Sequence, residues 1–116
     1  CQPDKTGTTV VFLPDKEIFE VTVYDYDILK QRLREMAFLT KGLKISLKDT
    51  REGMEREKVF HYEGGIREFV SYLNRSKEAL YPEIIYCEGQ QNGVSVEVAM
   101  QHNDSYTENC YGFFFF

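Results

Sequence analysis

The sequence lacks tryptophan and has only three prolines, eight glycines and three cysteines among its 116 residues. No period of about 20 to 50 residues recurs, which excludes repeat architectures. No apolar run approaches the roughly 20 residues that span a bilayer, so a membrane helix is not expected. Hydrophobic residues make up 42% and aromatic residues 15% of the chain, enough to build a core. These features predict a soluble globular piece about the size of one domain.

The strongest local signatures of chemistry are also missing. The sequence has no Walker loop, Rossmann glycine fingerprint, CxxC pair or HExxH helix. His61 and His102 are far apart in sequence and have no ligand set at metal-binding spacing, so we expect both to be structural. A Cys-His nucleophile would require Cys87 or Cys110 to lie beside a histidine in space, and nothing in the local sequence supports this.

Net charge restricts the partners that the chain can bind alone. The formal charge is -5, from 19 acidic and 14 basic residues. This balance argues against a free-standing nucleic-acid binder, which needs clustered basic residues to neutralise phosphates. One stretch concentrates positive charge and is either a solvated face or a DNA-facing wall in a larger assembly. Its members are Lys30, Arg32, Arg34, Lys41, Lys44 and Lys48.

The beginning of the chain and its cysteines suggest a compartment. The first residue is Cys1, and the opening CQPDKTGTT has neither a basic segment nor an apolar stretch, unlike a signal peptide. We therefore expect a chain that was processed or cut from a longer one. Three cysteines cannot all pair within the chain, and Cys87 and Cys110 lie in apolar runs where a free thiol packs as a small hydrophobe. A reducing, cytoplasmic location is predicted.

Periodicity predicts two helices. Residues 25–39 place apolar side chains at helical spacing, with acidic residues at the start and Gly42 just past the end. After Gly64 and Gly65, residues 66–73 repeat the pattern i, i+3, i+4 and i+7 in a short amphipathic helix.

Several strands are expected between and around these helices. Residues 8–13 are apolar and β-branched, which predicts a buried strand whose sheet partners lie outside the chain or far along it. Residues 43–48 and 58–62 form one predicted hairpin, and residues 84–88 and 94–101 a second. Residues 106–116 are a last candidate strand. The fold class is therefore predicted as α+β, with a mixed sheet packed against two helices.

Two pairs of carboxylates could serve as acid and base, namely Asp25 with Asp27 and Asp104 with Glu108. Their positions at a helix start and in a polar turn are explained better by capping and turn formation. On residue chemistry alone, the chain is an α+β domain with an unpaired first strand.

Four ordered blocks carry a resemblance to a known family. TGTTVVFLPDKEIF (6–19) resembles the closing strand of the nucleotide domain in the GHKL ATPases of type II topoisomerases. YDYDILKQRLREMAFLTKGLKISLKD (24–49), FHYEGGIREFVSYLN (60–74) and VEVAMQHNDSYTEN (96–109) are similar to successive blocks of the gyrase B transducer domain. The resemblance divides the chain into the edge of the ATPase domain (1–20) and an incomplete transducer domain (21–116).

The resemblance implies part of an ATP-hydrolysing DNA topoisomerase that introduces negative supercoils. It implies ATP and Mg²⁺ as cofactors of the whole subunit, and a gyrase A subunit, a second B subunit and double-stranded DNA as partners. In the family, Thr8 and Val10 correspond to positions at the adenine end of the ATP pocket, which aminocoumarin inhibitors also use. A threonine hydroxyl can bond an adenine edge or a bridging water, whereas Val10 offers only apolar contact. Ordinary strand packing explains either residue equally well.

The family's general base, magnesium ligand, adenine-reading aspartate and glycine-rich lid would lie before Cys1, and its phosphate-sensing lysine beyond Phe116. No catalytic residue is therefore assigned, and the isolated chain is expected to be inactive. One departure is the run Phe113–Phe116, where the family continues with a polar stretch; we interpret this run as a sequence-end artefact. The alternatives are a free-standing α+β binding module without catalysis and a small thiol enzyme using Cys87 or Cys110.

Overall fold

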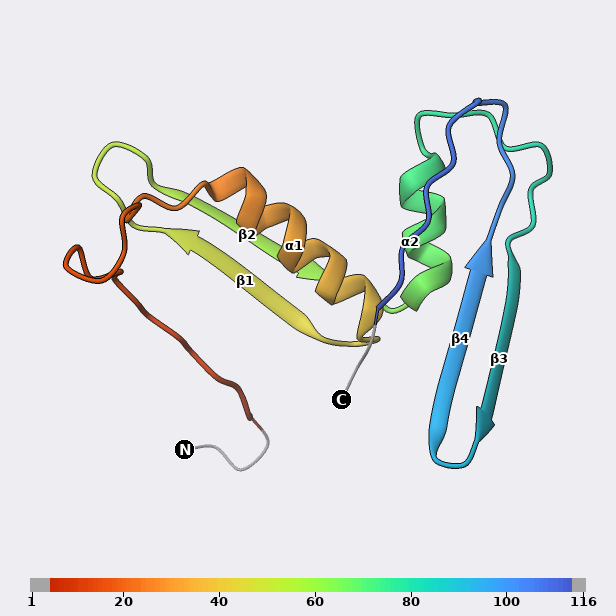
Figure 1. Ribbon diagram of the computed structural model, residues 1–116, viewed down its shortest axis with the longest axis horizontal. Coiled ribbons are helices and arrows are strands. Elements are labelled where there is room, and N and C mark those ends of the chain that lie inside the picture. The colour runs from red at the N-terminus through yellow and green to blue at the C-terminus, as the bar shows by residue number, and fades with distance from the viewer. Residues whose placement is uncertain (1–4, 114–116) are drawn as a thin grey trace.

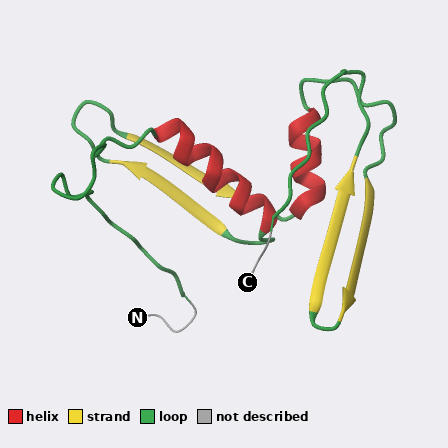
Figure 2. Cartoon of the chain, in the orientation of Figure 1, coloured by secondary structure: helices red, strands yellow, loops and turns green. Residues whose placement is uncertain are grey.

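The computed structural model describes residues 5–113 of the chain. Two helices and four strands follow one another in this order: α1 (Tyr26–Leu39), β1 (Lys44–Asp49), β2 (Arg56–His61), α2 (Gly65–Asn74), β3 (Ile85–Gln91) and β4 (Val94–Met100). The strands form two separate antiparallel sheets, β1 with β2 and β3 with β4 (Figure 2). The predicted α+β class is confirmed, with two small antiparallel sheets in place of one mixed sheet.

Helix α1 begins where the sequence predicts. Asp25 is its N-cap, and the Asp25 carboxylate accepts hydrogen bonds from the backbone N–H groups of Asp27 (2.8 Å) and Ile28 (3.2 Å). These bonds satisfy two of the donors that every helix start leaves unpaired. After Leu39 the chain turns through Gly42, whose φ of 78° lies in the region that favours glycine. The helix is therefore fixed at both ends by local chemistry.

The first hairpin lies under α1, as Figure 1 shows. Ile45 pairs with Phe60 and Asp49 with Arg56 in its antiparallel register. Along β1, Lys44, Ser46 and Lys48 are exposed while the residues between them are partly or fully buried. This alternation confirms the prediction of one apolar and one basic face.

An aromatic cluster joins the two helices. Phe38 of α1 is 1% exposed, and its ring stacks on Tyr62 with a centroid distance of 3.7 Å. The rings of Phe69 and Tyr72 in α2 each lie 5.3 Å from Phe38. Phe60 of β2 is equally buried. This cluster is the main apolar contact between the two halves of the described chain.

The second half consists of α2 and the hairpin β3–β4, with α2 packed along β4 (Figure 1). The hairpin is poorly covered, since Val94 is 62% and Val96 53% exposed. The guanidinium of Arg67 lies 3.9 Å from the ring centroid of Tyr86, which ties α2 to β3. The apolar alternation predicted for β4 is present, but the described residues leave most of it open to solvent.

Two predicted strands are not formed. Residues 8–13 have no regular secondary structure, and Val11 and Leu13 are more than 90% exposed. A strand needs a partner for its backbone groups, and no neighbouring strand in residues 5–113 supplies one. Residues 106–113 are likewise irregular, although Tyr111 and Phe113 place their rings against Phe69. Residues 114–116 of this predicted strand, and Cys1, lie outside the described part of the chain.

Candidate functional site

Thr8 and Val10, the residues predicted to line an ATP pocket, lie on an exposed, irregular segment. Val10 is 74% exposed. The groove between α1 and α2, lined by residues such as Arg34, Tyr72 and Arg75, includes neither of them. Their predicted role stays a prediction.

The segment that carries Thr8 and Val10 contacts the folded part of the chain through an aromatic pair. The ring of Phe12 meets the ring of Tyr24 edge to face, with centroids 5.2 Å apart. Such pairs stabilise by about 0.5 to 1.5 kcal/mol beyond their buried area. Tyr24 immediately precedes the N-cap of α1, so this contact lies where the N-terminal segment meets the helix.

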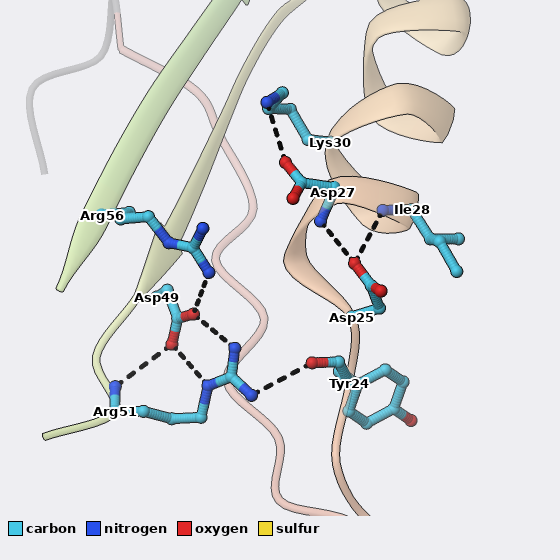
Figure 3. A network of polar contacts seen from close by, with 8 residues as sticks. All are labelled: Tyr24, Asp25, Asp27, Ile28, Lys30, Asp49, Arg51 and Arg56. Carbon is cyan, nitrogen blue, oxygen red and sulfur yellow. Dashed lines mark hydrogen bonds and ion pairs between the residues drawn. The ribbon is translucent and has the colours of Figure 1, made fainter. Parts of the chain in front are cut away.

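A polar network also holds the residues just before α1 (Figure 3). The Arg51 guanidinium donates two hydrogen bonds to Asp49, Nε to Oδ1 at 2.9 Å and Nη2 to Oδ2 at 2.6 Å. Its remaining nitrogen, Nη1, donates to the backbone carbonyl of Tyr24 at 3.1 Å. The backbone N–H of Arg51 also donates to Asp49 Oδ1 at 3.2 Å. One side chain thus joins the end of β1 to the residue before the helix cap.

Arg56 completes the network from β2. Its Nη2 lies 3.6 Å from Asp49 Oδ2, and its guanidinium lies 4.2 Å from the ring centroid of Tyr26. Tyr26 is the first residue of α1 and is buried. Asp49 is therefore held between two arginines, each of which also touches the start of α1 or the residues just before it.

The charge on Asp49 is stabilised by these contacts. The hydrogen bond from the Arg51 side chain lowers the pKa of Asp49 to about 2, against burial, which raises it. The Arg51 backbone N–H and the positive charges of Arg51 and Arg56 lower the pKa further. At neutral pH the carboxylate is ionised and satisfied, which is the condition for keeping a charge in a buried position.

Three of the carboxylates weighed as acid and base, Asp25, Asp27 and Asp104, make structural contacts. Asp25 caps α1, and Asp27 accepts from Lys30 at 3.0 Å, an interaction that lowers the pKa of Asp27. The Asp104 side chain accepts from the backbone N–H of Glu78 at 3.1 Å, and the Asp104 backbone N–H donates to the Glu78 carbonyl at 2.9 Å. Capping is confirmed for Asp25, whereas Asp104 joins its turn to Glu78, 26 residues earlier in the chain.

The basic stretch divides into paired and exposed members. Arg32 pairs with the buried Glu35 at 3.0 Å, and Arg34 donates to the hydroxyl of Tyr72. Lys44 and Lys48 lie on the exposed face of β1. Two exposed lysines therefore lie on this strand, one of them opposite Glu57 of β2, and a DNA-facing role for the basic stretch stays a prediction.

The histidines and cysteines do not form a catalytic pair in the described chain. His61 contacts the Leu43 carbonyl (3.4 Å) and Glu63 (3.4 Å), while His102 bonds the Tyr81 hydroxyl at 2.6 Å. Cys87 and Cys110 are free and exposed. The prediction that both thiols pack as small hydrophobes is wrong, because the β3–β4 hairpin and the irregular residues 106–113 lack a covering layer.

Within residues 5–113, no group of three or more His, Cys, Asp or Glu side chains is placed to hold a metal ion. No helix in that part of the chain is long and apolar enough to cross a membrane.

The Asp49, Arg51 and Arg56 network was not predicted from the sequence. The only local signal is an aspartate two residues before an arginine in a charged turn, a spacing that allows the bond between them. The contacts with Tyr24 and Tyr26 depend on the packing of α1 over the hairpin, which spacing does not reveal.

Comparison with known proteins places these features in context. A family model described as DNA gyrase B matches residues 65–114. The DNA gyrase B subunit of Clostridium acetobutylicum is 56% identical over 111 residues, which cover 95% of this chain and 17% of the relative. The DNA gyrase B subunit of Bacillus cereus is 50% identical over 111 residues, covering 95% of this chain and 27% of the relative.

Two solved structures are similar in fold. The crystal structure of the B-subunit of the DNA gyrase from Myxococcus xanthus has a TM-score of 0.72 and 27% identity, covering 90% of this chain and 31% of that one. The 43K ATPase domain of Thermus thermophilus gyrase B, in complex with an aminocoumarin, has a TM-score of 0.67 and 34% identity, covering 81% and 25%. The chain therefore spans less than a third of the length of these proteins.

Proposed function

The chain belongs to the DNA gyrase B family, and on that premise we propose that it is the part of an ATP-hydrolysing DNA topoisomerase that relays ATP-driven dimer closure to DNA strand passage. The observation that carries the proposal is 56% identity over 95% of the chain to a segment of a much longer gyrase protein. The whole protein would act with a gyrase A subunit, a second copy of itself and double-stranded DNA to introduce negative supercoils.

Residues 1–20 are assigned in this proposal to the edge of the ATPase domain and residues 21–116 to the transducer domain. The boundary falls between residues 20 and 21, a few residues before Tyr24, which both Phe12 and Arg51 contact. The irregular residues 5–13 and the regular elements from Tyr26 onward support this division. The alternative, a free-standing α+β binding module, does not explain the identity to a segment of a longer protein.

The chain's own residues supply only one side of the ATP site, at its adenine end. Thr8 has the hydroxyl that would bond an adenine edge or a bridging water. In the strand predicted for residues 8–13, Val10 would lie on the same face as Thr8 and add apolar contact. The described residues hold no group of three acidic or histidine ligands, so they do not fit Mg²⁺, which other parts of the protein would hold. The isolated chain is therefore proposed to be inactive.

Substitution of Thr8 in the full-length protein tests the adenine-end assignment. Thr8→Val keeps the shape and removes the hydroxyl, and the loss of one hydrogen bond should raise the KM for ATP by about fivefold. Thr9→Val is the matched control, because the strand predicted for residues 8–13 would place adjacent side chains on opposite faces. Equal ATP affinities for both variants and the unaltered protein would contradict the assignment of Thr8.

A further inference from the structure

A continuous series of contacts runs from the segment of Thr8 and Val10 to the first hairpin. Phe12 packs on the ring of Tyr24, and the Tyr24 carbonyl accepts from Arg51. Arg51 binds Asp49 at the end of β1 through two further nitrogens. Each link is a direct contact, and the series crosses the boundary proposed between the two domains.

The Arg51 guanidinium can hold two parts of the chain in a fixed orientation. A guanidinium is planar and presents its donors in a rigid fork, so two donors on Asp49 determine where the third points. That third donor meets a backbone carbonyl, which is present whatever the side chain at residue 24. The direction in which the N-terminal segment leaves α1 is thereby tied to the end of β1.

The rest of the junction is built to keep this arrangement. Asp49 is 9% exposed, and Arg56 approaches it from β2 while lying over the ring of Tyr26. Asp25 caps the helix between the two tyrosines. Both arginines therefore act on one short stretch, residues 24–26, and neither is explained by the hairpin turn alone.

We propose that Arg51, paired with Asp49 and bonded to the Tyr24 carbonyl, is a positioning residue. It transmits movement of the N-terminal segment, which belongs to the ATPase domain, to the first hairpin, β1–β2, of the transducer domain. This inference rests on the proposed function and deepens it by naming the residue that links the two domains. Arg51 touches no nucleotide and no DNA in this scheme. Its contribution is geometric, because it holds residues 5–24 at a set angle to α1.

The test uses the full-length protein together with its gyrase A partner, and compares Arg51→Ala and Arg51→Lys with the unaltered protein. Lysine keeps a positive charge beside Asp49 but cannot bond the carboxylate twice and the carbonyl once. Arg75→Ala is the matched control, since Arg75 also donates to a backbone carbonyl, that of Tyr72 at 3.1 Å, but only three residues away at the end of α2. The measured quantities are supercoils introduced per ATP hydrolysed, the KM for ATP, and the thermal unfolding midpoint.

Both Arg51 variants should lose at least about threefold in supercoils per ATP, with the KM for ATP unchanged, while Arg75→Ala matches the unaltered protein. Arg51→Lys should unfold within a few degrees of the unaltered protein, which separates positioning from stability. An unchanged ratio in Arg51→Lys and Arg51→Ala would overturn the role of Arg51. The role of Arg51 would also be overturned if supercoils per ATP fell only in variants whose unfolding midpoint fell as well, because lost stability would then explain the effect. Failure of the unaltered protein to supercoil DNA would instead overturn the proposed function, and with it the positioning role of Arg51.

Discussion

Removal of the Phe38 ring should be strongly destabilising. Phe38 is 1% exposed and touches three other aromatic rings, one of them stacked at 3.7 Å. Truncation of a buried phenylalanine to alanine costs about 3 to 5 kcal/mol, because apolar contact is lost and a cavity remains. The free energy of unfolding of a chain this size is roughly 6 kcal/mol at the low end of the usual range. Phe38→Ala should therefore remove most of the stability.

Circular dichroism during thermal unfolding of the isolated chain measures this effect. Phe38→Ala should lower the midpoint by about 15 °C or more, or abolish the transition. Ile28→Ala in the same helix is the control, because Ile28 is 62% exposed, and its midpoint should change by only a few degrees. Phe38→Leu, which keeps most of the volume, should fall between the two. Equal midpoints for Phe38→Ala and Ile28→Ala would refute the aromatic cluster as the core that joins α1 to α2.

Three further outcomes are expected from the described geometry. The pKa of Asp49 is lower in the folded chain than in the unfolded chain. The ionised carboxylate therefore stabilises the fold above the unfolded pKa of about 3.9, and this stabilisation is lost as the pH falls through about 2. The stability difference between the unaltered chain and Asp49→Asn, measured by urea unfolding, should shrink from pH 7 to pH 2. A hydrogen bond to Glu88, aided by burial, raises the pKa of Tyr86 to about 12, so ultraviolet titration should show a late tyrosine step that Glu88→Gln moves toward pH 10. Gly42→Ala places a side chain at a φ of 78° and should lower the unfolding midpoint by several degrees, for a cost of about 1 to 2 kcal/mol, whereas Gly7→Ala, with open space around it, should not.

The elements that local sequence controls were predicted well. Helix α1 was expected over residues 25–39 and forms over Tyr26–Leu39, because its apolar period and the Asp25 cap are both encoded within a few residues. The two hairpins were also expected, since each pairs neighbouring segments across a short turn. In these regions no distant part of the chain is needed to satisfy the backbone.

Features that depend on distant partners were not predicted correctly. The single mixed sheet requires pairing between segments far apart, and residues 5–113 form two separate hairpins instead. Residues 8–13 have no strand partner there, and the sheet partners predicted for them outside the chain stay a prediction. Cys87 was expected to be buried from its apolar surroundings, but burial also needs a layer above the sheet. The Asp49 network was missed for a similar reason, because its bonds to residues 24–26 arise only after α1 packs over the hairpin.

Nucleotide binding tests the central claim most directly. Titration calorimetry with ATP and magnesium should be performed on this chain and, alongside it, on the full ATPase region of the same protein. Binding by the longer protein, together with no heat of binding for the chain, is the predicted result, because the proposed function assigns only one side of the pocket to Thr8 and Val10. Tight, saturable binding of ATP by the chain alone would show that it has a site of its own, and would contradict its assignment as a relay segment of gyrase B.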